Sequence, residues 1–415
     1  MTRLAQLARL AAALAPLACA TTAVPPAAAQ IGSAIAAAPQ TLVRARPSPA
    51  GFSDALIPRV DSIITAAIAD GATPGATIAI ARRGRLVMLK GYGRADWPAG
   101  APAANDSTMY DMASLTKVVS ATTAAMILEE EGKLDLDRTV ASYLPEYDVP
   151  DKRTITVRML LTHTSGIQSF HPLWKEAKGR DAYFAGMIKY PLNHPPGTRA
   201  LYTDWNMVLL QFIVERLTGQ TLDAFVESRV FGPLGMRDTR YNPPASLKPR
   251  IAPTETEDFR GGQVWGEVHD ETAWVLGGVS GNAGLFSSAR DLAVFMQMLL
   301  NGGTYGGARI VRPATVARWT ARQRPDASRA LGWDTPSPNS SAGRYFSARS
   351  FGHTGFTGTS VWADPERDLL VVLLTNRVNP TRNNQKIGPL RRAVADAVQQ
   401  SIVDAPLRDW EAMLK

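Results

Sequence analysis

Short apolar runs near both ends of the chain constrain its fold more than any other feature. Residues 77–81 and 86–89 have the β-branched and apolar composition of two strands joined by a basic turn. Near the other end, residues 351–354, 359–363 and 369–375 have the pattern of three consecutive strands, the last a continuous apolar run. The sequence between these groups is mostly helical in pattern. We therefore expect one sheet assembled from both ends of the chain, with a helical lobe inserted between its two halves.

Helical periodicity supports this arrangement. Apolar residues recur with helical spacing over about 52–70, over 206–217, where Gly219 ends the run, and over about 387–403. The composition, with 45% hydrophobic and 20% charged residues, is that of a globular protein with a sizeable core. The predicted class is α/β (α+β), with an antiparallel sheet flanked by helices and no internal repeat.

The 415 residues could hold two or three average domains or one large two-lobed enzyme domain. We expect the second, over residues 51–405. Its sheet lobe is expected at about 51–105 plus 285–405, and its mainly helical lobe at about 106–284. An active site is expected in the cleft between the lobes. Ahead of the domain, residues 30–50 are rich in alanine and proline and weakly patterned, which predicts a flexible leader.

The first 29 residues have the pattern of a signal peptide. Arg3 and Arg9 form a positive start, residues 10–18 are apolar, and the three alanines 27–29 suit cleavage before Gln30. The apolar segment is too short, and too broken by a proline, to span a bilayer as a helix. We expect an exported protein, periplasmic or secreted, with no stable membrane span.

Cys19 is the only cysteine of the chain and lies inside this segment. The sequence before it distantly resembles a lipoprotein cleavage site, so a lipid anchor on Cys19 is the alternative to a simple signal peptide. After cleavage behind Ala29 the mature chain has no cysteine. It then has no disulfide, thiol nucleophile or cysteine metal site.

The charge pattern disfavours nucleic acid as a partner. The formal charge is +8, and removing Arg3 and Arg9, with no acidic residue before Gln30, leaves +6. The basic residues are scattered and form no long block with interleaved aromatics. A positively charged exported protein more readily meets an anionic envelope surface, and solubility alone explains the charge. The oligomeric state is left open.

Ser114 and Lys117 are the first candidate catalytic residues. They lie three positions apart in Ser-Leu-Thr-Lys, at the start of a predicted helix from Met112 to Glu131 with Asp111 as N-cap and Gly132 beyond its end. Residues at i and i+3 share one helical face, so the lysine can reach the serine hydroxyl. A serine needs a base to become a nucleophile, and a partly desolvated lysine can be that base.

Two further clusters supply partners. Tyr202, in Tyr-Thr-Asp, could carry a proton to a leaving group if it lies beside the serine. The alternative is a helix start capped by Asp204. The run His353, Thr354, Gly355 lies on a predicted strand whose edge N–H groups could line an oxyanion hole or an extended substrate. The alternative there is a buried, hydrogen-bonded histidine.

Two further segments superficially suggest ligand sites. They are a glycine-rich run over 277–286 and a His-Asp-Glu triplet at 269–271. The run lacks the Gly-Lys-Ser/Thr ending of a phosphate-binding loop, so we expect a tight turn beside the cleft. The triplet containing His269 has no second pair of ligands at useful spacing, so a loop that lines the cleft is favoured over a metal site. His163, in a turn after a helix, is expected to be structural.

Several motifs occur in order between about Phe52 and Ile402. They are Ser114–Lys117, Gly132–Asp137 (Gly-Lys-Leu-Asp-Leu-Asp), Leu160–Gly166 (Leu-Leu-Thr-His-Thr-Ser-Gly), Pro196-Gly197, Tyr202–Asp204, Pro233–Met236 and His353–Gly355. With them the chain resembles the serine β-lactamase and penicillin-binding-protein superfamily, specifically its class C β-lactamase, D,D-carboxypeptidase and esterase group. No Gly-x-Ser-x-Gly elbow is present, which argues against an α/β-hydrolase.

The resemblance implies a role for each matched residue. Ser114 would be the acylated nucleophile, Lys117 its base or proton carrier, and Tyr202 the acid/base partner. The oxyanion hole would consist of the backbone N–H groups of Ser114 and Phe356, beside the substrate-binding run from His353. The resemblance implies the β-lactamase/transpeptidase-like fold, and no metal or organic cofactor.

The chain departs from the family pattern at two positions. Asp204 stands where many relatives have asparagine, so an anion replaces an amide donor; it could hold Lys117 protonated and weaken β-lactam binding. His353 replaces the lysine of Lys-Thr-Gly relatives, and with an unperturbed pKa near ~6.5 it would be a switchable anchor for a substrate carboxylate. We therefore expect esterase or carboxypeptidase activity, on a small ester or a peptidoglycan D-Ala-D-Ala amide, ahead of β-lactamase activity. The alternative is a non-catalytic penicillin- or cell-wall-binding module of the same fold.

Overall fold

The computed structural model describes residues 41–413. The predicted signal peptide, its cleavage site and Cys19 lie outside the described residues. The 41–413 segment contains no helix long and apolar enough to cross a membrane.

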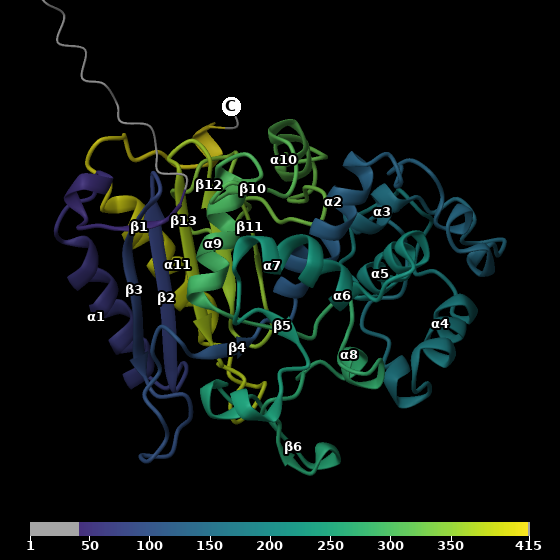
Figure 1. The fold of residues 1–415 in the computed structure, drawn as a ribbon, viewed down its shortest axis with the longest axis horizontal. Coiled ribbons are helices and arrows are strands. Elements are labelled where there is room, and N and C mark those ends of the chain that lie inside the picture. Colours follow the sequence, from purple (N-terminus) through teal and green to yellow (C-terminus); the bar gives the residue numbers. More distant parts are fainter. Residues whose placement is uncertain (1–40, 414–415) are drawn as a thin grey trace, which may run out of the picture. The chain divides into compact units, whose positions relative to one another are not determined.

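A six-stranded sheet combines both ends of the described chain, as the sequence predicts. Its strand order is β1-β3-β2-β13-β12-β11. The strands are β1 (Val43–Arg44), β2 (Gly75–Arg82), β3 (Arg85–Gly93), β11 (Phe351–Thr354), β12 (Ser360–Asp364) and β13 (Leu369–Thr375). Figure 1 shows the purple and blue strands of the first group beside the yellow strands of the second. The neighbours from β3 to β11 pair antiparallel, whereas β1 pairs parallel with β3.

The central strand β13 is buried on both faces, which explains its continuous apolar sequence. Successive side chains point to opposite faces, so two cores alternate along it. Leu369, Val371 and Leu373 pack in one core, with residues of α1 (Leu56–Ala69) and α11 (Ile387–Gln400). Leu370, Val372 and Leu374 pack in the other core, with α9 (Ala289–Leu300) and the central helices. The predicted N- and C-terminal helices thus cover the same face of the sheet (Figure 1).

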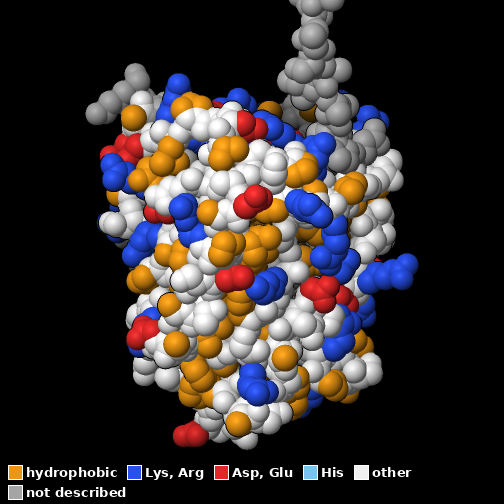
Figure 2. Space-filling model, turned by 90° about the vertical axis from the view of Figure 1, so that its left-hand side faces the viewer, with side chains coloured by type: hydrophobic (Ala, Val, Ile, Leu, Met, Phe, Trp, Pro, Cys, Tyr) orange, Lys and Arg blue, Asp and Glu red, His pale blue; other side chains and the backbone are white. Residues whose placement is uncertain are grey.

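The surface on the α1 side carries charges of both signs among scattered hydrophobic side chains, as Figure 2 shows. No long basic stripe crosses this face, in keeping with the scattered arginines and lysines of the sequence. On this face the basic side chains are therefore interspersed with acidic and apolar ones.

Helices are the main regular secondary structure between the two strand groups, in keeping with the prediction. The helices are α2 (Thr123–Glu130), α3 (Val157–Leu161), α4 (Arg180–Lys189), α5 (Trp205–Thr218), α6 (Leu222–Val226), α7 (Gly232–Leu234), α8 (Glu271–Val275) and, later, α10 (Pro313–Thr320). A small sheet joins β4 (Met109–Asp111), β8 (Leu285–Ser288) and β5 (Arg240–Tyr241), and two short hairpins are β6 (Thr256–Glu257) with β7 (Gly262–Gln263) and β9 (Thr304–Tyr305) with β10 (Ala308–Arg309).

The stretch predicted as a flexible leader differs from that prediction over residues 41–50. Val43 and Arg44 pair with Arg85 and Leu86 as an edge strand, and a 3₁₀ turn follows at Ser48–Ala50. An edge strand needs only backbone hydrogen bonds, which a weakly patterned sequence can supply as well as an amphipathic one.

The helix after Ser114 also differs from its prediction at its start. Asp111 ends strand β4 and does not cap the helix; helical backbone begins at Leu115, and Lys117–Thr122 winds as a π-helix before α2. The predicted end holds, because Gly132 adopts a φ of 72° and the backbone N–H of Lys133 returns to the Leu128 carbonyl. A π-helical turn is a rare feature that is enriched at functional sites.

Candidate active site

The turn before the helix positions Ser114. Ala113 has a φ of 44°, in the left-handed region that a non-glycine residue seldom adopts, and its N–H donates to Asp111 Oδ1 at 2.7 Å. Asp111, the residue predicted as a helix cap, therefore holds the turn that precedes Ser114. Such backbone strain concentrates at functional sites. Lys117 Nζ lies 3.0 Å from Ser114 Oγ, which confirms the contact expected from their spacing.

Lys117 is fully buried and has three polar partners. Besides Ser114, its Nζ donates to Asp204 Oδ1 at 2.6 Å and to the Asn282 carbonyl at 2.9 Å. Burial alone would lower the pKa of Lys117, but the negative charge of Asp204 and the Tyr202 oxygen raise it above its ordinary value. The resting lysine is therefore an ammonium ion.

Tyr202 is the second polar contact of the Ser114 hydroxyl. Its hydroxyl donates to Ser114 Oγ at 2.9 Å, and its ring lies 5.1 Å from Lys117 Nζ and 4.6 Å from the His163 ring. Burial raises the pKa of the Tyr202 phenol above 10, and the Lys117 charge only partly opposes this. His163 accepts from the Thr203 N–H and Asn206 Nδ2 through its Nδ1, so it acts as a support for the tyrosine ring. The predicted structural role of His163 fits this position.

Asp204 does not cap α5 in the way the alternative interpretation requires. It occupies the N-cap position of that helix, but its side chain makes no capping hydrogen bond. Its Oδ1 is instead bound to Lys117. The departure from the family asparagine therefore acts directly on the charge of the lysine.

The glycine-rich run forms the expected turn beside the site, and it contacts Lys117 through a backbone carbonyl. The Asn282 carbonyl accepts from Lys117, and the Asn282 amide donates to Asp270 Oδ1 at 3.0 Å. A Cβ on Gly281 would lie 2.1 Å from the Met207 carbonyl oxygen, so this turn needs glycine for a close approach to α5. Burial and the charge of Asp204 raise the pKa of Asp270 to about 6. The sequence does not point to Asp270 as part of the site. Its contact with Asn282 forms only when the glycine-rich turn folds against it, and no local pattern predicts that.

His353 lies on β11 near the Tyr202 ring, at a centroid distance of 6.1 Å. Its Nδ1 donates to the Thr354 carbonyl at 2.8 Å, so Nε2 carries the lone pair, and Nε2 is buried with no partner among the described residues. Burial, with the charges of Arg329 and Lys117, lowers the pKa of His353 to about 3. The expectation of a histidine that titrates near neutral pH is therefore wrong, because the sequence showed neither the burial nor the two cations.

Arg329 is a positive charge that the motifs did not reveal. Its guanidinium carbon lies 5.3 Å from the Tyr202 ring centroid, its side chain is 19% exposed, and its one ion pair within 41–413 is a 3.9 Å contact with Asp334. It acts on both His163 and His353, whose pKa values it lowers after the larger effect of burial. In the sequence Arg329 is a lone arginine outside any motif or periodic pattern, so its place in the site could not be predicted.

The two backbone N–H groups that the resemblance assigns to an oxyanion hole are unpaired. Neither Ser114 N–H nor Phe356 N–H has an acceptor in the described chain. Their segments touch, because Thr357 Oγ1 donates to the Asp111 carbonyl at 2.7 Å and Thr359 Oγ1 to the Met112 carbonyl at 3.1 Å. The close approach requires Gly355, where a Cβ would lie 2.4 Å from the Met112 oxygen.

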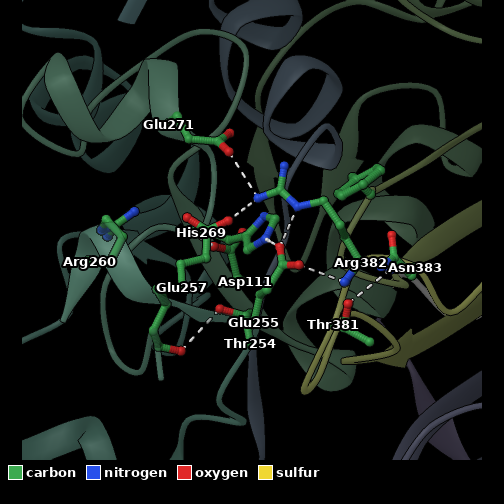
Figure 3. Close-up of polar contacts among 12 residues, drawn as sticks. Asp111, Thr254, Glu255, Glu257, Arg260, His269, Glu271, Thr381, Arg382 and Asn383 are labelled. Atoms are coloured by element: carbon green, nitrogen blue, oxygen red, sulfur yellow. Dashed lines mark hydrogen bonds and ion pairs between the residues drawn. The ribbon is translucent and has the colours of Figure 1, made fainter. Parts of the chain in front are cut away.

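Figure 3 shows a largely buried cluster of carboxylates around His269 and Arg382. His269 Nε2 lies 2.8 Å from Glu255 Oε2, and candidate ligand atoms of Glu255, Glu257 and His269 lie within 4.8 Å of one another. The Arg382 guanidinium enters the same cluster and pairs with Glu255, Glu257 and Glu271. Glu255 and Glu257 lie only two positions apart, but the sequence does not show that the chain folds back to bring His269 beside them. The Arg382 guanidinium thus supplies a positive charge among these carboxylates.

The cluster also touches the site. The His269 N–H donates to Asp111 Oδ2 at 2.7 Å, and the His269 ring stacks on Phe356 at 5.9 Å. The cluster thus braces both segments that carry the unpaired N–H groups.

Comparison with known proteins decides the family. The family model described as "Beta-lactamase" matches residues 60–396. The chain belongs to the beta-lactamase family. A curated relative from Salmonella agona (strain SL483), named "Putative D-alanyl-D-alanine carboxypeptidase", is 34% identical over 394 residues, covering 86% of this chain and 91% of the relative. A relative of the same name from Salmonella typhimurium matches over the same shares.

Solved structures agree on the fold of this family member. A penicillin-binding protein homologue from Caulobacter crescentus is 26% identical with a TM-score of 0.69, covering 85% of this chain and 99% of the homologue. A class C beta-lactamase is 20% identical with a TM-score of 0.70, and the match covers 85% of this chain and 98% of the beta-lactamase chain. The predicted β-lactamase/transpeptidase-like fold is confirmed.

Proposed function

We propose that this beta-lactamase-family serine hydrolase is exported and forms an acyl-enzyme on Ser114, with a small ester or amide as substrate. The observation that carries the proposal is the position of Ser114 Oγ, 3.0 Å from Lys117 Nζ and 2.9 Å from the Tyr202 hydroxyl. A nucleophile within hydrogen-bond reach of a base, with that base held by further groups, is the arrangement of covalent catalysis. Asp204 and the Asn282 carbonyl are those further groups here.

The reaction proceeds in two displacements. Ser114 Oγ bonds to the substrate carbonyl carbon while its proton passes to the Lys117–Tyr202 pair. The carbonyl oxygen becomes an oxyanion beside the free N–H groups of Ser114 and Phe356. The tetrahedral intermediate then breaks its bond to the leaving oxygen or nitrogen, which takes a proton from Tyr202. Water attacks the acyl-enzyme by the same route and releases the acid and free Ser114.

The charges of the pair set its pH dependence. Lys117 and Tyr202 both have raised pKa values, so the resting pair holds both of its protons near neutral pH. It must lose one proton before it can accept that of Ser114. The active fraction therefore grows as the pH rises.

The substrate that fits best carries a carboxylate near the leaving group. Arg329 supplies a fixed positive charge beside Tyr202, while His353 is neutral and cannot provide one. The curated relatives are named for D-alanyl-D-alanine, whose terminal carboxylate is such a group. We therefore favour a D,D-carboxypeptidase or an esterase over a true β-lactamase, in keeping with Asp204 in place of an amide donor.

A binding module of the same fold is the second candidate, and Asp204 is the feature that favours it. By holding Lys117 charged, Asp204 could leave acyl transfer too slow for turnover.

Hydrolysis assays separate the two functions. The mature protein is tested on a p-nitrophenyl ester, a D-Ala-D-Ala peptide and nitrocefin, each with wild type and Ser114→Ala. The enzyme hypothesis predicts turnover of the ester or the peptide that the variant loses. Stoichiometric labelling by a fluorescent penicillin without turnover of any substrate would favour the binding module. Equal turnover by wild type and variant would remove Ser114 from the mechanism.

A further inference from the structure

Arg391, on α11, is a charged side chain that the mechanism does not use. Its Nη2 donates to the Gly355 carbonyl and to the Thr359 carbonyl, both at 2.7 Å. Its Nε is buried without a partner, and no carboxylate of residues 41–413 forms an ion pair with it. Burial and the charge of Arg377 lower the pKa of Arg391 to about 9, so the guanidinium is charged at neutral pH. A largely desolvated cation without an anion is costly, which calls for a reason.

The Gly355 carbonyl belongs to a particular peptide group. The same group carries the N–H of Phe356, one of the two unpaired N–H groups beside Ser114. In a trans peptide the C=O and N–H bonds point in opposite directions, so a cation behind the carbonyl leaves the N–H facing away from it. A hydrogen bond to the oxygen also draws electron density from the nitrogen, which strengthens the N–H as a donor.

We propose that Arg391 is a positioning residue that fixes and polarises the Gly355–Phe356 peptide, so that the Phe356 N–H stabilises the oxyanion. This rests on the acyl-enzyme proposed above. The charge of the guanidinium is left without a carboxylate because a neighbouring anion would cancel its effect on the carbonyl. The Gly358 N–H also donates to the Gly355 carbonyl, at 3.1 Å, and closes the turn that holds the peptide.

Arg377 provides a matched comparison. Its Nε donates to the Phe356 carbonyl at 2.8 Å, and its guanidinium lies 4.3 Å from the Phe356 ring centroid. That carbonyl belongs to the next peptide along the chain, whose N–H is on Thr357. Loss of Arg377 therefore removes a similar arginine–carbonyl contact from the same loop without depolarising the Phe356 N–H.

The test reads the hydrogen bond at the acyl carbonyl directly. Wild type, Arg391→Met, Arg391→Lys and Arg377→Gln are acylated with a slowly hydrolysed ester that carries a ¹³C label at its carbonyl. The infrared frequency of the labelled carbonyl reports the strength of the oxyanion-hole hydrogen bonds, and pre-steady-state kinetics give the acylation rate and KM. Arg392→Gln, an exchange of the neighbouring arginine on α11, is the surface control.

We expect Arg391→Met to raise the carbonyl frequency and slow acylation about tenfold, with KM changed less than twofold; loss of a whole oxyanion donor costs ~10²–10³. Arg391→Lys should keep most of the wild-type frequency, and Arg377→Gln and Arg392→Gln should leave it unchanged. A wild-type frequency in Arg391→Met, or an equal shift in Arg377→Gln, would overturn the inference. If the methionine variant does not fold, Arg391→Gln is read in the same way.

Failure of the proposed function would give a result that can be told apart from failure of the Arg391 proposal. If wild type forms no labelled acyl-enzyme under any condition, the covalent mechanism itself is wrong. An acyl-enzyme that forms equally fast in every variant would reject the role of Arg391 alone.

Discussion

The two sides of the site handle charge in opposite ways. On the nucleophile side, comprising Ser114, Lys117, Tyr202 and Asp204, a buried ammonium meets a carboxylate at 2.6 Å. On the strand side, comprising residues 353–356, the histidine is neutral and the nearby cations, Arg329 and Arg391, have at most a distant anion. Lys117 is therefore neutralised by a close carboxylate, whereas the charges of Arg329 and Arg391 are not.

This difference separates proton transfer from charge stabilisation. A paired ammonium is held in place and gives up its proton reluctantly, so the nucleophile side controls when the serine reacts. Arg391 has no carboxylate partner among the described residues, and Arg329 has only a 3.9 Å contact with Asp334. The strand side can therefore attract negative charge in a substrate or support an N–H donor. Substitutions on the two sides should therefore affect different kinetic constants.

The largest effect is expected from Lys117→Met on the nucleophile side. It removes the group that shares the Ser114 proton and leaves Asp204 without its partner. The acylation rate should fall by at least ~10³-fold, as for other residues that act as a unit with the nucleophile. Pre-steady-state ester hydrolysis measures this rate. Lys133→Met, an exchange of a half-exposed lysine paired with Glu131, should keep wild-type activity, and a similar loss there would point to a non-specific effect.

The pH profile tests the pairing of Lys117 with Asp204. Because both pKa values of the Lys117–Tyr202 pair are raised, kcat/KM of wild type should rise from pH 6 to pH 9. Asp204→Asn removes the negative charge, so the pKa of Lys117 should fall and the rise should move to lower pH by about one unit or more. Identical profiles for the two proteins would show that Asp204 does not control the pair.

On the strand side, Arg329→Gln should act on substrate binding. For a D-Ala-D-Ala peptide, KM should rise roughly 10- to 100-fold, the range for loss of one charge-assisted hydrogen bond. A neutral p-nitrophenyl ester has no carboxylate and should keep its KM. If both substrates lose affinity equally, Arg329 shapes the site rather than binding a carboxylate.

The smallest effect concerns His353. With a pKa of about 3, His353 stays neutral as the pH rises from 5 to 8, so KM for an anionic substrate should change less than twofold over this range. Lysine in this position would be charged, and His353→Lys should lower that KM. A wild-type KM that rises severalfold between pH 6 and 8 would show that the histidine does titrate there.

Much of the fold could be predicted because its signals are local. The continuous apolar run of β13 and the Gly219 that ends α5 leave clear patterns in sequence, and so do the strands of both ends. The contact of Ser114 with Lys117 could be predicted for the same reason, since four residues determine it. The start of the helix could not, because Asp111 forms its hydrogen bonds to Ala113 and to the distant His269.

The charge state of the strand side could not be predicted from motifs. It depends on burial of His353 and on Arg329 and Arg391, which lie in separate segments and belong to no local pattern. The same holds for Arg382, which joins three glutamates from another part of the chain. Long-range contacts of single charged residues leave no periodic signal for sequence reasoning to use.

Acylation of Ser114 can be observed directly by mass spectrometry of the protein quenched during ester turnover. Wild type should gain the mass of one acyl group, and proteolysis should place this mass on the peptide containing Ser114. Ser114→Ala should gain none, and its hydrolysis should fall by at least ~10³-fold. Turnover without an acylated species in wild type, or an acyl group on another residue, would show that Ser114 is not the nucleophile.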